Sequence, residues 1–205
     1  MTGPTHKVYS ILFAFLTAIL LYHINISNIN YYLILIIVLL VSKKGAVFPD
    51  LDHNWQSIGD KSVPNKIINT IIHITGGKHR SWQTHSIDIC TIFTLSTYFV
   101  PCYLYNIGKI TGINKEVIII LGLGFASGWI SHLFSDMLTS GGVRLICFLK
   151  FKVKFVPRQI GKLKFNTGNE WEKFNYKTIS ILNKIVGCLS LTYPFIISYI
   201  LEWRG

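Results

Sequence analysis

Residues 117–136 read VIIILGLGFASGWISHLFSD and combine the two features that decide the fold. The first 19 of them carry no charge, and a helix of about 20 apolar residues is long enough to cross the hydrocarbon core of a bilayer. His132 and Asp136 then place two ionisable groups where burial in an apolar segment is costly. Because they are four residues apart, they share one face of the predicted helix. The stretch predicts a membrane-spanning helix with a polar site near one end; a His–Asp hydrogen bond between packed helices is the alternative for the pair.

Four further apolar runs predict a mainly α, multi-pass helical membrane protein with about five apolar helices. They are residues 8–21, 31–41, 87–107 and 179–201. The second run is short and spans only if Lys43 and Lys44 extend their amines to the headgroups, so a half-buried helix is the alternative there. Only Lys7 precedes the first run and no small-residue cleavage site follows it, so we expect an uncleaved helix. We expect residues 1–205 to form a single membrane-embedded domain.

The composition narrows the class of protein. Half of the residues are hydrophobic and only 14% are charged, against about 25% in an average soluble domain. Lys and Arg nevertheless outnumber Asp and Glu by 20 to 9. The apolar content excludes a disordered chain, and four cysteines without a CxxC pair exclude a disulfide-based scaffold. An apolar, basic chain is typical of a membrane protein with a cationic face, so we expect the lipid bilayer as partner and not nucleic acid.

The distribution of Lys and Arg predicts the orientation in the membrane. With the five runs taken as spans, alternate loops carry 16 Lys and Arg on one side and 3 on the other. Because cytoplasmic loops are enriched in positive charge, the N-terminus and both long loops are predicted to be cytoplasmic. The C-terminus is then predicted to lie on the opposite side.

Both long loops contain secondary-structure patterns of their own. Residues 64–74 follow an amphipathic pattern, which predicts a helix along the membrane surface. Residues 150–156 alternate Lys with apolar side chains, and residues 162–165 repeat this alternation. The repeat predicts a small basic β-hairpin in a cytoplasmic loop. Its cationic face is either simply solvated or in contact with anionic lipid headgroups.

The predicted orientation gathers most histidines and aspartates at the cytoplasmic face. Neutral imidazoles and carboxylates form the mixed nitrogen and oxygen set that binds Zn²⁺, Mn²⁺ or Fe²⁺. Zinc is the first expectation, and the number of candidates leaves room for one or two ions. Arg80 belongs to the same group and could bind an anionic substrate in bidentate fashion. The candidate ligands are His6, Asp50, Asp52, His53, His79, His85, His132 and Asp136.

Structural interpretations of these groups stay open at this point. Taken alone, Asp50 or Asp52 is more typical of a helix N-cap or a turn residue after Pro49. His79 and its arginine neighbour suit contacts with lipid headgroups. His23 falls at the opposite membrane face and His73 in the amphipathic segment, so we expect neither to be functional.

The same residues lie in short motifs spaced along the chain. These are Thr5-His6, residues 48–53 with 57–59, His79-Arg80, residues 84–86, residues 128–132, 136–139 and 141–143, and Gly168-Asn169 with Glu172. With them the chain resembles the YdjM-like family of bacterial inner-membrane proteins, which are predicted metal-dependent hydrolases. The resemblance implies a multi-pass protein of the bacterial inner membrane with a hydrolase-like site. It also implies the candidate metal ligands His6, Asp50, His53, His79, His85, His132 and Asp136. We expect Asp52, Arg80 and Glu172 to be the catalytic residues, with Asp50 or Asp52 as a base or a bridging ligand.

Two functions follow as expectations. The first is a membrane-bound metal-dependent hydrolase that acts on a phosphoester at the cytoplasmic face, with a lipid headgroup as one candidate substrate. The alternative is a non-catalytic inner-membrane protein whose structural metal site supports recruitment of a regulatory protein or a role in envelope stress. A structural site is closed by four protein ligands, whereas a catalytic site keeps a position for water. A transporter with a midplane ion site is less favoured because the candidate ligands gather at one face.

Overall fold

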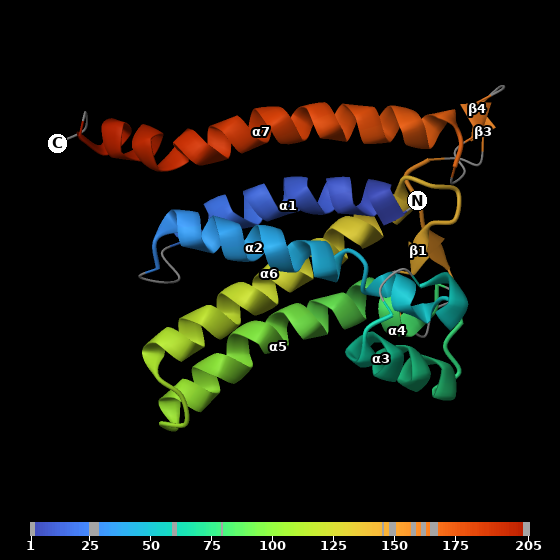
Figure 1. The fold of residues 1–205 in the computed structure, drawn as a ribbon, viewed down its shortest axis with the longest axis horizontal. Helices are drawn as coiled ribbons and strands as arrows, with labels where there is room; N and C mark the ends of the chain where they lie inside the picture. The colour runs from blue at the N-terminus through green and yellow to red at the C-terminus, as the bar shows by residue number, and fades with distance from the viewer. Residues whose placement is uncertain are drawn as a thin grey trace.

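In the computed structural model, five long helices lie side by side, and the polar connecting segments gather at one end of the bundle (Figure 1). The structure describes residues 3–24, 29–58, 61–78, 80–144, 146–147, 151–156, 159–160, 163–164 and 168–202. All five helices are long and apolar enough to cross a membrane, which confirms the predicted mainly α, multi-pass architecture. The two ends of the chain lie at opposite ends of the bundle, as an odd number of crossings requires (Figure 1).

The predicted apolar runs all form helices. Helix α6 lies at the centre and packs against α1, α2 and α5, while α7 packs against α1. Helix α7 begins at Glu170 rather than at residue 179, because its polar first turns are fixed to α1. Thr5 donates a hydrogen bond to Glu172 and Tyr9 donates one to Asn175, contacts that an apolar pattern does not reveal. The long helices are α1 (Gly3–His23), α2 (Tyr31–Gly45), α5 (Ile87–Asn106), α6 (Gly112–Met137) and α7 (Glu170–Glu202).

Helix α2 is the shortest of the five. Its 15 residues extend about 22 Å at 1.5 Å per residue, against a hydrocarbon core of about 30 Å. The 3-10 helix η1 (Pro49–Asp52) follows it and extends the candidate span to Asp52. Ile34 and Val38 of α2 are almost fully buried, and the helix packs against both α1 and α6. The second run is therefore part of the bundle and supports the count of five candidate spans.

Glycines allow α2 and α6 to pack closely. A Cβ atom at Gly128 would overlap the Ser42 carbonyl, and one at Gly45 would overlap the Phe125 backbone. Small residues of this kind let helix backbones approach in membranes, where helix association depends on close packing. This contact fixes the position of the segment that follows α2, and that segment carries several of the candidate ligands.

The second long loop forms small β-structures at the polar end of the bundle. Strand β1 (Val143–Arg144) pairs antiparallel with β2 (Lys152–Val153), and β3 (Gln159–Ile160) pairs with β4 (Leu163–Lys164). A small basic hairpin is therefore present, but its expected pairing between residues 150–156 and 162–165 is wrong. Only two residues, one of them a glycine, separate β3 from β4, and such a short connection favours pairing of immediate neighbours. Strand β2 consequently pairs back onto β1.

The first long loop contains η2 (Trp55–Ser57), α3 (Val63–Ile74) and the single-turn helix α4 (Trp82–His85). Helix α3 confirms the predicted amphipathic helix. It exposes Val63, Ile67, Ile71 and Ile74 along one face. On the other face, the buried Asn69 amide donates hydrogen bonds to the backbone carbonyls of Leu51 and His53, which ties α3 to η1.

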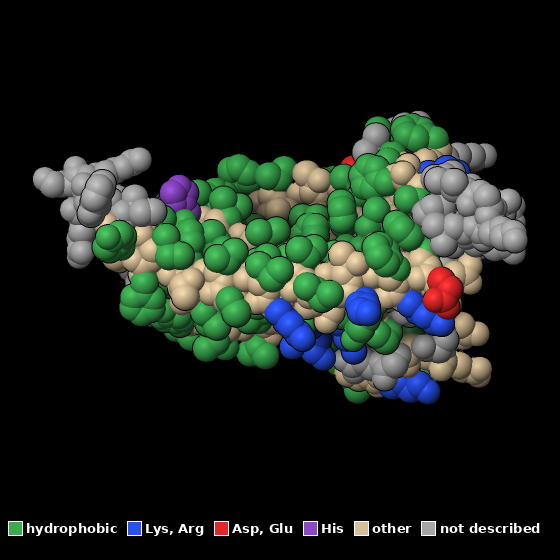
Figure 2. All heavy atoms as spheres, turned by 90° about the horizontal axis from the view of Figure 1, so that it is seen from above, with side chains coloured by type: hydrophobic (Ala, Val, Ile, Leu, Met, Phe, Trp, Pro, Cys, Tyr) green, Lys and Arg blue, Asp and Glu red, His purple; other side chains and the backbone are tan. Residues whose placement is uncertain are grey.

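The outer faces of the bundle are apolar. Figure 2 shows hydrophobic side chains along one face, with Lys and Arg gathered toward the end where the polar loops lie. Leu40 of α2, Phe99 of α5 and Leu189 of α7 are each more than half exposed in the isolated chain. Exposed apolar helices of this length are typical of contact with lipid.

Candidate metal centre

Three histidines and two aspartates from four separate elements converge at the polar end of the bundle. His6 comes from α1, Asp50 from η1, His85 from α4, and His132 and Asp136 from α6. They form two potential ligand groups, His6–His132–Asp136 and Asp50–His85–His132, which share His132. In each group the ligand atoms lie within 4.8 Å of one another. The prediction that these separated motifs meet at one face of the bundle therefore agrees with the structure.

His132 is oriented by the segment after α2. Its Nδ1 lies 2.7 Å from the Ala46 carbonyl oxygen, which can only accept a hydrogen bond. Nδ1 must therefore carry the proton, so Nε2 presents its lone pair. This Nε2 lies 3.7 Å from Asp136 Oδ2 and 3.8 Å from Asp50 Oδ1, while the ring is fully buried.

His85 is oriented in the same way by Asp52. Its Nδ1 lies 3.1 Å from Asp52 Oδ2, which also accepts hydrogen bonds from the Ser81 amide at 3.0 Å and the Thr84 hydroxyl at 2.8 Å. The carboxylate thus keeps the proton on Nδ1 and leaves the Nε2 lone pair toward the centre. A carboxylate behind an imidazole in this way commonly orients a metal-binding histidine.

His6 completes the set through a serine on α6. Its Nδ1 lies 2.6 Å from Ser135 Oγ, and Ser135 in turn donates to the His132 carbonyl at 2.9 Å. The hydroxyl oxygen therefore accepts from His6 Nδ1, and Nε2 again presents its lone pair, 3.7 Å from Asp136 Oδ1. The His6 and His132 rings are stacked, with their centroids 3.7 Å apart.

The donor atoms fit a divalent transition-metal ion. The Nε2 atoms of His85 and His132 face each other at 3.2 Å, each with a lone pair, an arrangement that is repulsive without a cation between them. At a zinc–nitrogen distance of about 2.0–2.1 Å, two imidazoles on one tetrahedral ion are about 3.3 Å apart. Asp136 adds a buried carboxylate within 3.7 Å of three imidazole nitrogens. Nitrogen and carboxylate donors in this number suit Zn²⁺, Mn²⁺ or Fe²⁺.

One side of the centre is open to solvent. The Asp50 side chain is 28% exposed and the His53 side chain 37%, and the two lie 3.6 Å apart. By contrast, the side chains of His6, His132 and Asp136 are at most 2% exposed. A small molecule could therefore reach the centre past Asp50, whereas the ligands on α1 and α6 are sealed from water.

Arg80 reaches the centre from the loop before α4. Its guanidinium NH2 lies 3.3 Å from Asp136 Oδ1. A Cβ atom at Gly141 would overlap this guanidinium, so the glycine provides the space that the arginine occupies. The Arg80 backbone has a φ of 58°, in the left-handed region that non-glycine residues seldom adopt. Such strain is tolerated where the surroundings require one particular side-chain position.

Two further cations lie beside Arg80. Arg144 of β1 stands directly opposite Lys152 of β2, although like charges in register destabilise a strand pair. The pKa of the Lys152 amine is lowered, mainly by partial burial and then by the charges of Arg80 and Arg144. The Nε atoms of both arginines are buried without a hydrogen-bond partner in the described part of the chain. We call Arg80, Arg144 and Lys152 the cationic rim.

The remaining predicted site residues take other positions. Glu172 accepts hydrogen bonds from Thr5 Oγ1 at 2.7 Å and from the Gly168 amide at 2.6 Å, and it belongs to neither ligand group. His53 also lies outside both groups, at the solvent side of Asp50. His79 lies outside the described residues.

The two histidines expected to have no function, His23 and His73, belong to neither ligand group. His73 is exposed and contacts the carbonyls of Gly77 and His53. His23 contacts the Tyr193 hydroxyl at the far end of α1.

Sequence reasoning missed the groups that orient the imidazoles. The Ala46 carbonyl cannot be recognised from residue type, because every residue has one. Ser135 was detectable in principle, since it lies three residues after His132 and directly before Asp136 on the same helix. Gly141 was visible only as part of a motif, and its role depends on where Arg80 folds.

Comparison with known proteins agrees with this architecture. The profile of the YdjM inner membrane protein family matches residues 1–202, almost the whole chain. The search of curated proteins and the search of solved structures each returned no match. Because the family profile covers far more than half of the sequence, the chain belongs to the YdjM inner membrane protein family.

Proposed function

We propose that the protein is a membrane-bound metal-dependent hydrolase whose centre lies at the cytoplasmic face of the inner membrane. The observation that carries this proposal is the common orientation of His6, His85 and His132. Each directs Nε2 toward Asp136 because its Nδ1 is engaged by an acceptor. Three imidazoles oriented in the same way around one buried carboxylate indicate a metal site far more specifically than a mere cluster of ionisable side chains does.

The cationic rim supports an anionic substrate, and a phosphoester is the class we propose. Arg80 has planar guanidinium donors that match phosphoryl oxygens. Arg144 and Lys152 add positive charge on the same side. The negative charge of Asp136 acts to raise the pKa of Lys152, which places this amine within electrostatic range of the centre. An incoming phosphate would relieve the repulsion among the three cations.

The residues of the chain then have distinct roles. His6, His85, His132 and Asp136, with Asp50, would bind the metal; when bound, the ion would activate water and polarise a phosphoryl oxygen. Asp52 keeps the His85 proton on Nδ1 and acts as a positioning residue. Asp50, the most exposed carboxylate of the centre, would offer one oxygen to the metal, and its second oxygen would accept a proton from attacking water. Glu172 would position the start of α1, and hence His6, through Thr5.

Purified protein is expected to contain at least one equivalent of zinc, manganese or iron and to hydrolyse a member of a phosphoester panel. Elemental analysis and a panel of phosphomonoesters, phosphodiesters and phospholipids would measure both properties. Substoichiometric metal in folded protein never exposed to chelator would contradict the metal site. Stoichiometric metal without hydrolysis of any panel member would favour the structural alternative, in which the site supports a regulatory protein partner.

The proposed orientation makes a separate prediction. Because positive charge is concentrated at the end that carries the centre, a reporter fused to the end of α7 is expected to face the periplasm. Alkaline phosphatase should be active there, and green fluorescent protein should not. A fusion truncated after Ser140 should give the opposite pair of results. A reporter at the end of α7 that is active only in the cytoplasm would reject this orientation.

A further inference from the structure

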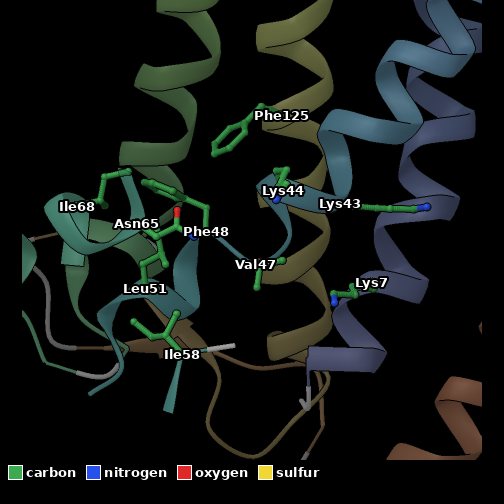
Figure 3. A pocket seen from close by; sticks show the side chains of 10 residues that line it. All are labelled: Lys7, Lys43, Lys44, Val47, Phe48, Leu51, Ile58, Asn65, Ile68 and Phe125. Carbon is green, nitrogen blue, oxygen red and sulfur yellow. The ribbon is translucent and has the colours of Figure 1, made fainter. Parts of the chain in front are cut away.

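A cavity of about 580 Å³ lies on the other side of residues 46–52 from the metal centre. It opens between the α1–α2 pair and α3, as Figure 3 shows, and Phe125 of α6 forms its inner wall. The volume falls within the range of about 300–1,000 Å³ that is typical of small-molecule sites. It is lined by Lys7, Lys43, Lys44, Val47, Phe48, Leu51, Ile58, Asn65, Ile68 and Phe125.

The lining is divided by chemistry. Lys7, Lys43 and Lys44 lie on the side of α1 and α2, whereas Phe48 and Ile68 belong to the apolar side (Figure 3). Apart from Asn65, the rest of the lining is aliphatic or aromatic. An occupant that matches both sides has an apolar chain and a negatively charged head.

The surfaces beside the cavity indicate that this occupant is a lipid. Below Lys43 and Lys44, the outer face of α2 exposes Ile36 and Leu40, so the lysines lie at the boundary of an apolar surface. On the opposite side of the cavity, α3 exposes the apolar face formed by Val63, Ile67, Ile71 and Ile74, as helices in the membrane interface do. The cavity therefore lies between two lipid-facing surfaces at the level where Lys side chains meet headgroups.

We propose that this cavity binds one anionic phospholipid, with its phosphate beside Lys7, Lys43 and Lys44 and an acyl chain against Phe48, Ile68 and Phe125. The site goes beyond the proposed hydrolase activity, because it uses none of the metal ligands. Binding requires no hydrolysis of the lipid.

The lipid would nevertheless act on the metal centre through a shared segment. Val47, Phe48 and Leu51 line the cavity, whereas Asp50 and Asp52 of the same segment reach the metal centre. Phe48 also packs on Trp129, with ring centroids 4.7 Å apart. A bound acyl chain would therefore support the segment that positions two carboxylates.

The test is a comparison of lipid affinities by native mass spectrometry of detergent-purified protein. Phosphatidylglycerol is expected to bind roughly tenfold more tightly than phosphatidylcholine with the same acyl chains. The triple variant Lys7→Gln/Lys43→Gln/Lys44→Gln should lose this preference. A matched variant, Lys109→Gln/Lys177→Gln/Lys184→Gln, removes the same charge from exposed positions elsewhere and should keep it.

A second pair of variants tests the apolar part. Ile68→Trp fills the cavity and should weaken binding of both lipids, whereas Ile67→Trp, on the exposed face of α3, should not. Circular dichroism would establish that the variants remain helical, and the Ile68 and Ile67 pair remains decisive if the lysine variant unfolds. Equal affinity of the wild type for both lipids, an equal loss in the matched triple variant, or unchanged binding by Ile68→Trp would each overturn the proposal. Because no readout involves hydrolysis, a protein with no enzymatic activity would leave this result intact.

Discussion

The Asp136→Asn variant is expected to lose bound metal and to lose hydrolytic activity by on the order of a hundredfold or more. Asparagine has nearly the same shape but no negative charge. Asp136 lies within 3.7 Å of nitrogens from His6, His85 and His132, so its negative charge would attract a cation held by any of these imidazoles. The fold should survive, because the substitution keeps the volume and one carbonyl oxygen at a buried position of α6. Elemental analysis, phosphoester hydrolysis and thermal stability in detergent measure the three properties.

His23→Gln is the control for this variant. His23 lies at the far end of α1, where it contacts Tyr193, and its loss should leave metal content and activity unchanged. If Asp136→Asn kept full metal and full activity, the assignment of this residue to the centre would be wrong. If it lost metal and unfolded, and the wild type hydrolysed none of the panel, the structural role would be favoured over catalysis.

The sequence predicts which motifs come together at the centre better than it predicts how their side chains are placed. Hydropathy and charge counting place the motifs around His6, Asp50, His85 and His132 at one face, because a spanning helix can only end on one side or the other. That argument does not require knowing any side-chain contact. It does not separate ligands from neighbours, and it treated His53 as equal to His85 although only His85 faces His132.

The rest depends on contacts between segments far apart in the sequence. Asp52 was expected to bridge a metal or act as a base, but its Oδ2 accepts hydrogen bonds from Ser81 and Thr84 and lies 3.1 Å from Nδ1 of His85, the ring nitrogen that faces away from the other ligands. Glu172 was assigned by a motif alone, and its burial against Thr5 follows from how α7 packs on α1. The predicted strand pairing was wrong for a related reason. Alternation identifies strands but not their partners, and the short connection between β3 and β4 favours pairing of these two strands.

The second large effect is expected from Gly128→Ala. Gly128 is not a candidate ligand, but it lies one helical turn before His132 on α6. A Cβ atom here would overlap the Ser42 carbonyl on α2. Because the obstacle is backbone rather than a flexible side chain, the two helices must separate, at a cost of about 1–3 kcal/mol. We expect a clear decrease in the thermal unfolding temperature, measured by circular dichroism in detergent.

The same displacement should weaken the metal centre. Helix α2 leads directly to Ala46, whose carbonyl lies 2.7 Å from His132 Nδ1 and fixes the protonation of that imidazole. A shift of α2 lengthens this hydrogen bond, so metal should be lost at temperatures where the helices are still folded. Gly112→Ala, on the same helix α6, is the matched control, because its Cβ would meet nothing closer than the Tyr105 side chain of α5 at 3.8 Å. If Gly128→Ala were as stable and as rich in metal as Gly112→Ala, close packing of α2 on α6 would not be what positions His132.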